Sequence, residues 1–273
     1  MKTFFVVLTL SLFLPTYAQD FSGRATYQTK MILKDFNEKV AEDPSKISKS
    51  FIEAVKRASE KTFILEFTKE ESLYTEEKTL ELPTSTGKPK NRVIINTEDS
   101  GTLYKNLKEN YSILENDRFN KTNLIKDTLE IAGWELLTES KQIGNYTVYK
   151  ATKTVKKEVS TEKEDREKTS NLLEMLDKKE PEDWVYVAWY TPQIPTPNGP
   201  GKFGGLPGLI LELHDPRQET VYLCSEIVLN PKKPIEIKIP KGKIISQEDY
   251  DKMREENIKK YRRESKIFRR ETR

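Results

Sequence analysis

Cysteine and histidine are almost absent from this chain of 273 residues, which contains one of each. Cys224 has no partner for a disulfide within the chain, and with His214 it cannot supply the ligands of a structural zinc site. A nucleophile activated by an imidazole would have to use His214, which precedes Asp215 and Pro216 in a sequence typical of a turn. We therefore expect Cys224 to be a small buried residue and His214 to belong to a turn.

Familiar catalytic motifs are absent as well. The sequence contains no Gly-x-Ser-x-Gly, His-Glu-x-x-His, P-loop or dinucleotide-binding glycine pattern in the context that each requires. Carboxylates are abundant, but the sequence defines no pair at the separation of a glycosidase centre. We expect no catalytic residue, no metal ion and no cofactor, and predict that the protein is not an enzyme. A hydrolase built on carboxylates is the alternative.

Only the beginning of the chain carries a long apolar run. Lys2 is followed by an apolar core from Phe4 to Leu14 and then by Thr16-Tyr17-Ala18, the layout of a secretory signal peptide cleaved after Ala18. The core is too short to span a bilayer, and no cysteine follows it to carry a lipid anchor. We expect an exported protein in the periplasm, at the outer-membrane surface or outside the cell.

Charge is nearly balanced, with 47 basic and 44 acidic residues, but it is unevenly distributed. Residues 241–273 hold twelve basic and seven acidic side chains, a net charge of +5. Ser246 and Asp249 have the spacing of a helix capping box, which predicts a basic C-terminal helix or tail. Such a tail can contact acidic lipid headgroups or an acidic partner, or lie in solvent. No nucleic-acid recognition motif accompanies it, so we expect no nucleic-acid partner.

Between the signal peptide and the tail, residues 19–240 are predicted to form one β domain. Alternating apolar residues predict a meander of strands, and no helical crossover separates them. One helix, residues 45–60, and one charged insertion, residues 156–182, interrupt the pattern. The predicted fold is mainly β (α+β): a single antiparallel, strongly curved sheet or incomplete barrel with peripheral helices. By analogy of architecture it is similar to the half-barrels of bacterial lipoprotein carriers. The predicted strands are 21–33, 62–68, 72–82, 92–97, 101–107, 111–114, 134–137, 143–155, 221–229 and 235–239.

The central run, Trp184 to Leu213, organises the rest of the chain. It begins as an aromatic strand, crosses a loop rich in proline and glycine, and continues as an apolar strand from Leu209. Pro207 and Gly208 are expected at the middle of a type II turn. The loop is either a rigid connection that closes the β core or a stiff docking surface at the rim of a pocket. The candidate ligand- or partner-binding residues are Trp184, Trp189, Tyr190, Phe203 and Leu206.

A family resemblance rests on this run. Gly205-Leu206-Pro207-Gly208-Leu209-Ile210 resembles the namesake motif of the GLPGLI family of exported gram-negative proteins. The block Ala188–Pro195 resembles that family's AWYTPEIP block, with Gln193 where glutamate is usual. Upstream, Trp134-Glu135-Leu136 and the block Lys141–Ala151 are similar to a second family block, with an inserted Asn145 and with Val148 in place of the usual cysteine. The family is uncharacterised, so the resemblance implies export and a fold but no activity.

These observations lead to three functional hypotheses. The first is a non-enzymatic exported envelope protein that binds an apolar ligand or an outer-membrane partner through the curved sheet and the Pro/Gly loop. The second is a structural accessory subunit of an outer-membrane complex, with the basic tail as its contact. The third is the carboxylate-based hydrolase. Separately, Asp127-Thr128-Leu129 matches a short sequon that some gram-negative lineages glycosylate on the hydroxyl, so Thr128 is a candidate O-glycosylation site, and chance is the alternative.

The signal-peptide prediction can be checked on protein purified from the cells that produce it. We expect the mature chain to begin at Gln19, because the small residue Ala18 closes the predicted cleavage site. Intact-mass measurement and N-terminal sequencing decide this. A chain that keeps Met1 and fractionates with membranes would show that the segment is an anchor.

Overall fold

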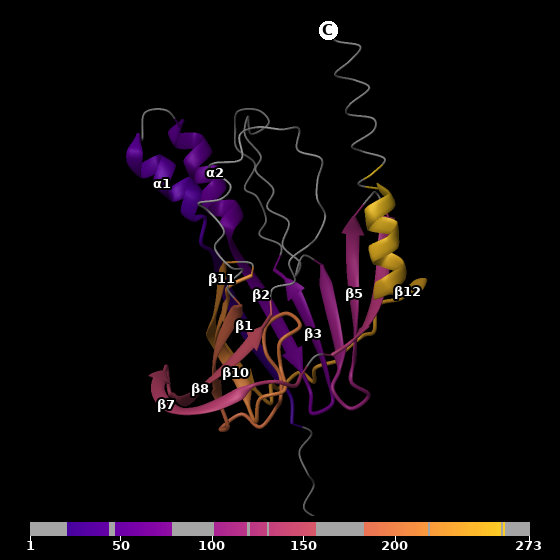
Figure 1. Ribbon diagram of the computed structural model, residues 1–273. Helices are drawn as coiled ribbons and strands as arrows, with labels where there is room; N and C mark the ends of the chain where they lie inside the picture. Colours follow the sequence, from indigo (N-terminus) through magenta and orange to yellow (C-terminus); the bar gives the residue numbers. More distant parts are fainter. Residues whose placement is uncertain are drawn as a thin grey trace, which may run out of the picture.

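Twelve strands form one continuous sheet in the computed structural model, and this sheet curves without closing into a barrel (Figure 1). The structure describes residues 21–43, 47–77, 101–118, 121–129, 131–156, 183–217, 219–257 and 259. The predicted fold, mainly β with one curved, open sheet and peripheral helices, is confirmed. The predicted signal peptide, the strand at 92–97, the charged insertion from 157 onward and the end of the basic tail lie outside the described residues.

The first described strand, β1 (Gly23–Met31), lies in the middle of the sheet, and two arms extend from it. The sheet order is β12-β6-β5-β4-β3-β2-β1-β11-β10-β9-β8-β7. Neighbouring strands are antiparallel except β12 and β6, which pair in parallel. The first arm contains β2 (Glu60–Phe67), β3 (Glu71–Glu76), β4 (Thr102–Asn106), β5 (Tyr111–Arg118), β6 (Lys121–Thr128) and β12 (Ile244–Ser246). The second arm contains β11 (Thr220–Leu229), β10 (Leu209–Asp215), β9 (Trp184–Thr191), β8 (Tyr146–Val155) and β7 (Glu135–Ile143).

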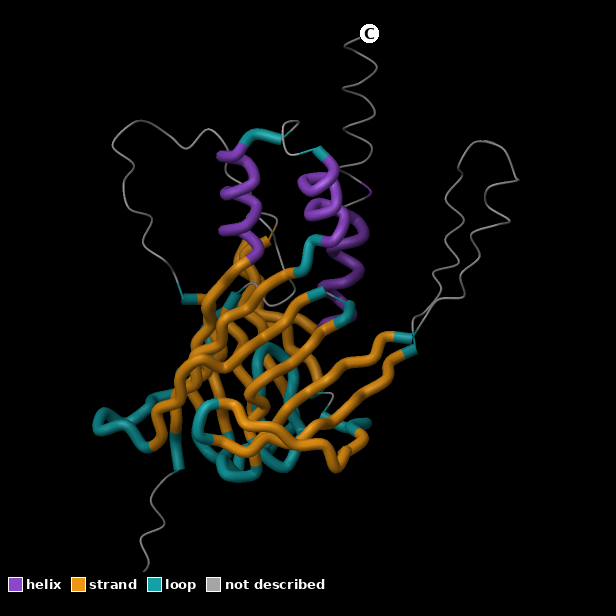
Figure 2. The backbone as a smooth tube through the Cα atoms, turned by 90° about the vertical axis from the view of Figure 1, so that its left-hand side faces the viewer, coloured by secondary structure: helices purple, strands orange, loops and turns teal. Residues whose placement is uncertain are grey.

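The helices lie at the periphery. Helices α1 (Lys34–Glu42) and α2 (Lys49–Ser59) connect β1 to β2 and stand together at one end of the strands (Figures 1 and 2). The Oγ of Ser48 accepts a hydrogen bond from the Phe51 amide, which explains why the predicted helix 45–60 begins at residue 49. A third helix occupies residues 247–257. As predicted, Ser246 caps it, because its Oγ accepts from the Asp249 amide at 3.1 Å.

Several elements differ from the sequence prediction. Helix α1 and strand β12 were not predicted, and β7 extends to Ile143, whereas the predicted strand ended at residue 137. Strand β6 was not predicted because its two apolar residues, Leu124 and Ile125, are adjacent and therefore face opposite sides of the sheet. The predicted strand 235–239 is wrong: the segment has no ladder partner, and the flanking Pro234 and Pro240 offer no backbone donor. Its Ile237 instead packs on a small cluster formed by Tyr104, Ile113 and Leu124.

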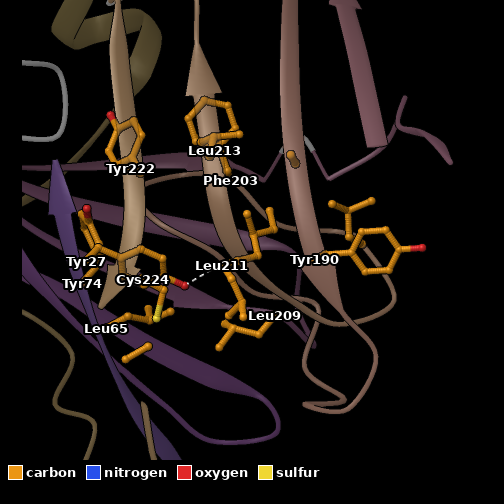
Figure 3. Packing of buried hydrophobic residues seen from close by; sticks show 14 of the residues in the cluster. Tyr27, Leu65, Tyr74, Tyr190, Phe203, Leu209, Leu211, Leu213, Tyr222 and Cys224 are labelled. Carbon is orange, nitrogen blue, oxygen red and sulfur yellow. Dashed lines mark hydrogen bonds between the residues drawn. The ribbon is translucent and has the colours of Figure 1, made fainter. Parts of the chain in front are cut away.

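The main core lies on one face of β1, β2 and β9–β11, where side chains from both arms point into the same interior (Figure 3). Tyr27 is fully buried there, and its hydroxyl donates to the carbonyl of Ile210 at 2.7 Å. That carbonyl lies at a β-bulge, since the pairing of β10 with β9 shifts between Ile210 and Glu212. Burial raises the pKa of Tyr27 well above its usual value, and it raises the pKa of the Cys224 thiol to about 12.

Replacing Tyr27 with phenylalanine should lower the free energy of unfolding by about 1–3 kcal/mol at neutral pH, because the Ile210 carbonyl loses its partner. The wild-type protein should also lose stability as the pH rises above 10. The unfolded chain then releases the tyrosine proton, whereas the folded chain, with its raised pKa, retains it. Tyr27→Phe should flatten this alkaline decline.

Denaturant unfolding at neutral and alkaline pH measures both effects. Tyr149→Phe is the matched control, because that ring is 39% exposed. Equal stability and an equal alkaline slope for the Tyr27 and Tyr149 variants would contradict this account of the bulge.

Candidate functional site

The Pro/Gly loop, residues 192–208, folds back into the core instead of projecting from it. Ile194 and Leu206 are almost completely buried, and Phe203 is 9% exposed. The Phe203 ring packs against Tyr186 of β9, with ring centroids 5.4 Å apart. All three loop residues belong to the same cluster as Tyr27 and Leu213, so the loop fills the inner side of the curved sheet.

The loop is ordered by its own backbone. Asn198 and Gly204 form an antiparallel bridge, and the Gly205 amide donates to the Pro197 carbonyl at 3.0 Å. Further along, the amides of Leu209 and Ile210 donate to the carbonyls of Ile194 and Asn198 at 3.1 and 3.0 Å. These bonds pair part of the polar backbone of this buried segment.

Two glycines of the motif 205–210 are required by close approach. Gly205 has a φ of +85°, and a Cβ there would lie 2.0 Å from the Ile131 carbonyl oxygen. At Gly208 a Cβ would lie 2.1 Å from the carbonyl oxygen of Thr191. The predicted type II turn is wrong, because Gly208 does not have a positive φ; its amide donates to the Leu206 carbonyl two residues back at 2.7 Å, the pattern of a γ-turn centred on Pro207.

Trp134 links the two sequence blocks that carry the family resemblance. Its indole Nε1 donates to the Gly204 carbonyl at 2.9 Å, directly beside the motif. Gly205 packs on the backbone of Ile131, three residues before Trp134. Segments about seventy residues apart in the chain therefore meet at one contact, because the tryptophan donor and the side-chain-free glycine fit each other.

The residue that sequence reasoning missed is Lys105 of β4. Its side chain is 1% exposed, and its Nζ donates to the carbonyls of Gly199, Gly201 and Phe203 at 2.9, 2.9 and 3.1 Å. β4 belongs to the arm opposite β9 and β10, so this ammonium group ties the loop of one arm to a strand of the other. Nothing in the local sequence Thr-Leu-Tyr-Lys-Asn distinguishes this lysine from one that faces solvent.

The five candidate binding residues separate into two environments. Tyr190, Phe203 and Leu206 lie in the core, with exposed fractions of 9% or less. Trp184 is half-buried at the start of β9, with the Arg217 guanidinium 6.0 Å from its ring centroid. Trp189 is also half-buried, but strand alternation places it on the face opposite Tyr190. The structure therefore gathers three of the five inside the fold. Trp184 and Trp189 are partly buried against the edge of the same core, with Trp189 on the face of β9 opposite Tyr190.

Trp189 lies within a partly exposed surface that we call the outer patch. In register across the sheet, Trp189 faces Glu212 of β10, which faces Leu223 of β11; in the next row Val187 faces His214, which faces Val221. The apolar residues on β9 and β11 thus flank two polar residues of β10. Val185 and Leu223 are 46% and 42% exposed. The outer patch consists of Val185, Val187, Trp189, Glu212, His214, Val221 and Leu223.

Charged side chains border Trp189. The Nζ of Lys141 lies 2.6 Å from Glu212 Oε2 and 4.3 Å from the centroid of the Trp189 ring. The Nζ of Lys150 lies 6.0 Å from the same ring and pairs with Glu139 at 2.9 Å. A cation over an indole face holds the ring in place by cation–π attraction, so Trp189 is a positioned side chain and not a freely rotating one.

The sequence also singled out His214, Cys224 and Thr128, and the structure shows the surroundings of each. The expected turn begins later than predicted: His214 is exposed but still pairs within β10, and the turn follows Asp215, whose Oδ1 accepts from the Arg217 amide at 2.9 Å. Cys224 is 8% exposed, in keeping with the predicted buried residue. Thr128 is exposed at the end of β6, where a glycan could reach its hydroxyl, so the glycosylation prediction stays open.

Across the described ranges, no three His, Cys, Asp or Glu side chains are grouped so as to hold a metal ion. None of the helices in that same part of the chain is both long and apolar enough to cross a membrane.

Comparison with known proteins gives a partial family match. Residues 134–212 match the model of a family described as "Protein of unknown function (Porph_ging)". This segment contains Trp134, the Pro/Gly loop and the motif 205–210, and the match supports an uncharacterised family without naming GLPGLI. No curated protein matches the chain.

Two solved structures of PNGF-II, in two crystal forms, are similar to the chain at 15% sequence identity. Their TM-scores are 0.43 and 0.48, and the similarity covers 83% and 85% of this chain. The chain spans about a third of the length of PNGF-II, 31% and 32% in the two forms.

The close approach at Gly205 can be tested against a glycine of similar backbone conformation. Gly205→Ala should lower the free energy of unfolding by about 3 kcal/mol or more, because the new methyl group meets the Ile131 carbonyl and the positive φ disfavours alanine. Gly144 also has a positive φ, +55°, but a Cβ there would have no neighbour within 4 Å, so Gly144→Ala should cost only about 1–2 kcal/mol. Denaturant unfolding of the pair isolates the steric contribution, and equal costs would contradict it.

Proposed function

We propose that this protein is a non-enzymatic exported binding protein, and that it holds an envelope protein partner through the outer patch. The observation that carries this proposal is the exposure of apolar side chains on one face of a rigid sheet: Val185 at 46% and Leu223 at 42%, beside the half-buried Trp189. Apolar side chains gathered on one face and bordered by charge are characteristic of protein–protein contact sites.

The packing on the inner side of the sheet argues against an apolar ligand and therefore for a protein partner. A ligand held in the curve of the sheet would contact Tyr190, Phe203 and Leu206, yet these side chains already pack in the core with the loop. To admit a ligand there, the loop would have to give up the three hydrogen bonds from Lys105. Each broken bond would leave a buried carbonyl without a partner, which costs about 1–3 kcal/mol.

The outer patch has the composition of a binding surface. Tryptophan contributes a large share of the binding energy at many interfaces, and Trp189 is held in a fixed orientation by Lys141. Glu212 already has Lys141 as its ion-pair partner, so a protein covering the patch need not supply a cation for it. On this proposal the Pro/Gly loop is the internal support of the sheet, and the partner contacts the opposite face.

The test introduces charge into the patch. Val185→Asp combined with Leu223→Asp should abolish partner binding while the fold remains, because both side chains are more than two-fifths exposed and aspartate at an interface centre is unpaired. Trp189→Ala should weaken binding by about 2 kcal/mol or more. Native mass spectrometry of the mature protein purified from its own envelope, followed by organic extraction, identifies what is bound.

Ile239→Asp combined with Ile244→Asp is the matched control, since these residues are 45% and 46% exposed and lie outside the patch. Loss of the partner in the control but not in the patch variant would overturn the proposed surface. A lipid recovered in the organic extract, with no bound protein, would instead favour the apolar-ligand hypothesis. Loss of the partner only on truncation before Ser246 would favour the accessory subunit that contacts through its tail.

A further inference from the structure

The contact between Lys105 and the loop has the form of a binding site for a cation. A lysine ammonium group has three N–H donors, and three carbonyl oxygens of the loop accept from it at 2.9, 2.9 and 3.1 Å. The carbonyls belong to alternate residues, Gly199, Gly201 and Phe203, within five residues of chain. With the lysine 1% exposed, these oxygens take the place of its hydration shell.

The loop backbone is bent so that these oxygens converge. Gly201 has a φ of +50°, a conformation that turns its carbonyl out of the direction of a regular strand. At Gly199 a Cβ would lie 2.7 Å from the Ile210 side chain, so the chain can lie this close to β10 only without a side chain. Backbone carbonyls converging on one point can bind a monovalent cation.

We propose that residues 199–203 form a binding site for a primary ammonium ion, and that Lys105 is its built-in ligand. The loop takes its folded form around this charge, much as other loops fold around a bound metal ion. The site shares no residue with the outer patch, and its test measures the protection of the loop and not the binding of a partner.

Chemical rescue tests the proposal. Lys105→Ala removes Cγ, Cδ, Cε and Nζ, and n-propylammonium has those same four heavy atoms. In the variant, hydrogen exchange should accelerate by about tenfold or more at the amides of Gly205, Leu209 and Ile210, which donate to loop carbonyls, because the loop opens locally. Added n-propylammonium chloride should restore the protection and raise the melting temperature of the variant, and leave the wild-type protein unchanged.

Two comparisons separate the charge from simple filling of space. 1-Propanol has the same shape as n-propylammonium without its charge, and should not restore protection. Lys105→Met fills the space of the lysine stem with an apolar chain, and its loop amides should stay unprotected with or without n-propylammonium.

Wild-type protection in Lys105→Met, or equal rescue of Lys105→Ala by 1-propanol, would show that the site needs volume and no charge, and would overturn the proposal. If Lys105→Ala does not fold alone, refolding in n-propylammonium chloride but not in 1-propanol with sodium chloride would support it. Refolding in neither, together with a protected loop in Lys105→Met, would refute it.

Discussion

The Lys105 ammonium group is buried inside the fold and connects the two arms of the sheet. β4 supplies the side chain, and the connection between β9 and β10 supplies the three carbonyls that accept from it. Removing a lysine from water is costly, and three short charge-assisted hydrogen bonds offset that cost only if the loop holds its carbonyls in place. The contact is possible only because the sheet is curved, since a flat sheet would keep β4 far from the β9–β10 connection.

The Pro/Gly loop is held on its other side by close backbone contacts. Gly205 and Gly208 lie against the carbonyls of Ile131 and Thr191, and Trp134 donates to Gly204. The segment matched by the family model, 134–212, contains the tryptophan, the loop and both glycines, whereas Lys105 lies outside it. The matched residues therefore form one structural unit: a loop that folds back onto its own strands and is held there by a hydrogen bond from Trp134. The lysine that fixes this unit to the remainder of the sheet comes from elsewhere in the chain.

Sequence alone predicted the parts of this fold whose signal is local. Alternation identified β1 and β2, aromatic and β-branched residues identified β9, and the Ser246–Asp249 pair identified the start of the last helix. The alternation of side chains along a strand also divided β9 correctly into a Trp189 face and a Tyr190 face. It did not predict which of the two faces is covered. That depends on where the loop folds, and the loop's position depends on Lys105, about ninety residues before it in the chain. An aromatic residue in a proline-rich loop fits a pocket rim and a packed core equally well, so Phe203 and Leu206 could not be placed from sequence.

The two faces of β9 lie in different environments, so variants of the loop and variants of the outer patch must be interpreted separately. Ala188 and Tyr190 pack toward the loop, while Val187 and Trp189, their neighbours on β9, belong to the patch. Because the loop packs against the inner face of β9, a loop variant that displaces β9 also changes the spacing of Trp189, Glu212 and Leu223 across three strands. A loop variant that loses a binding partner is therefore no evidence that the loop touches the partner. Only a change on the outer face that leaves Lys105 and its carbonyls in place tests the proposed partner surface, because the interior of the sheet is already filled by the chain itself.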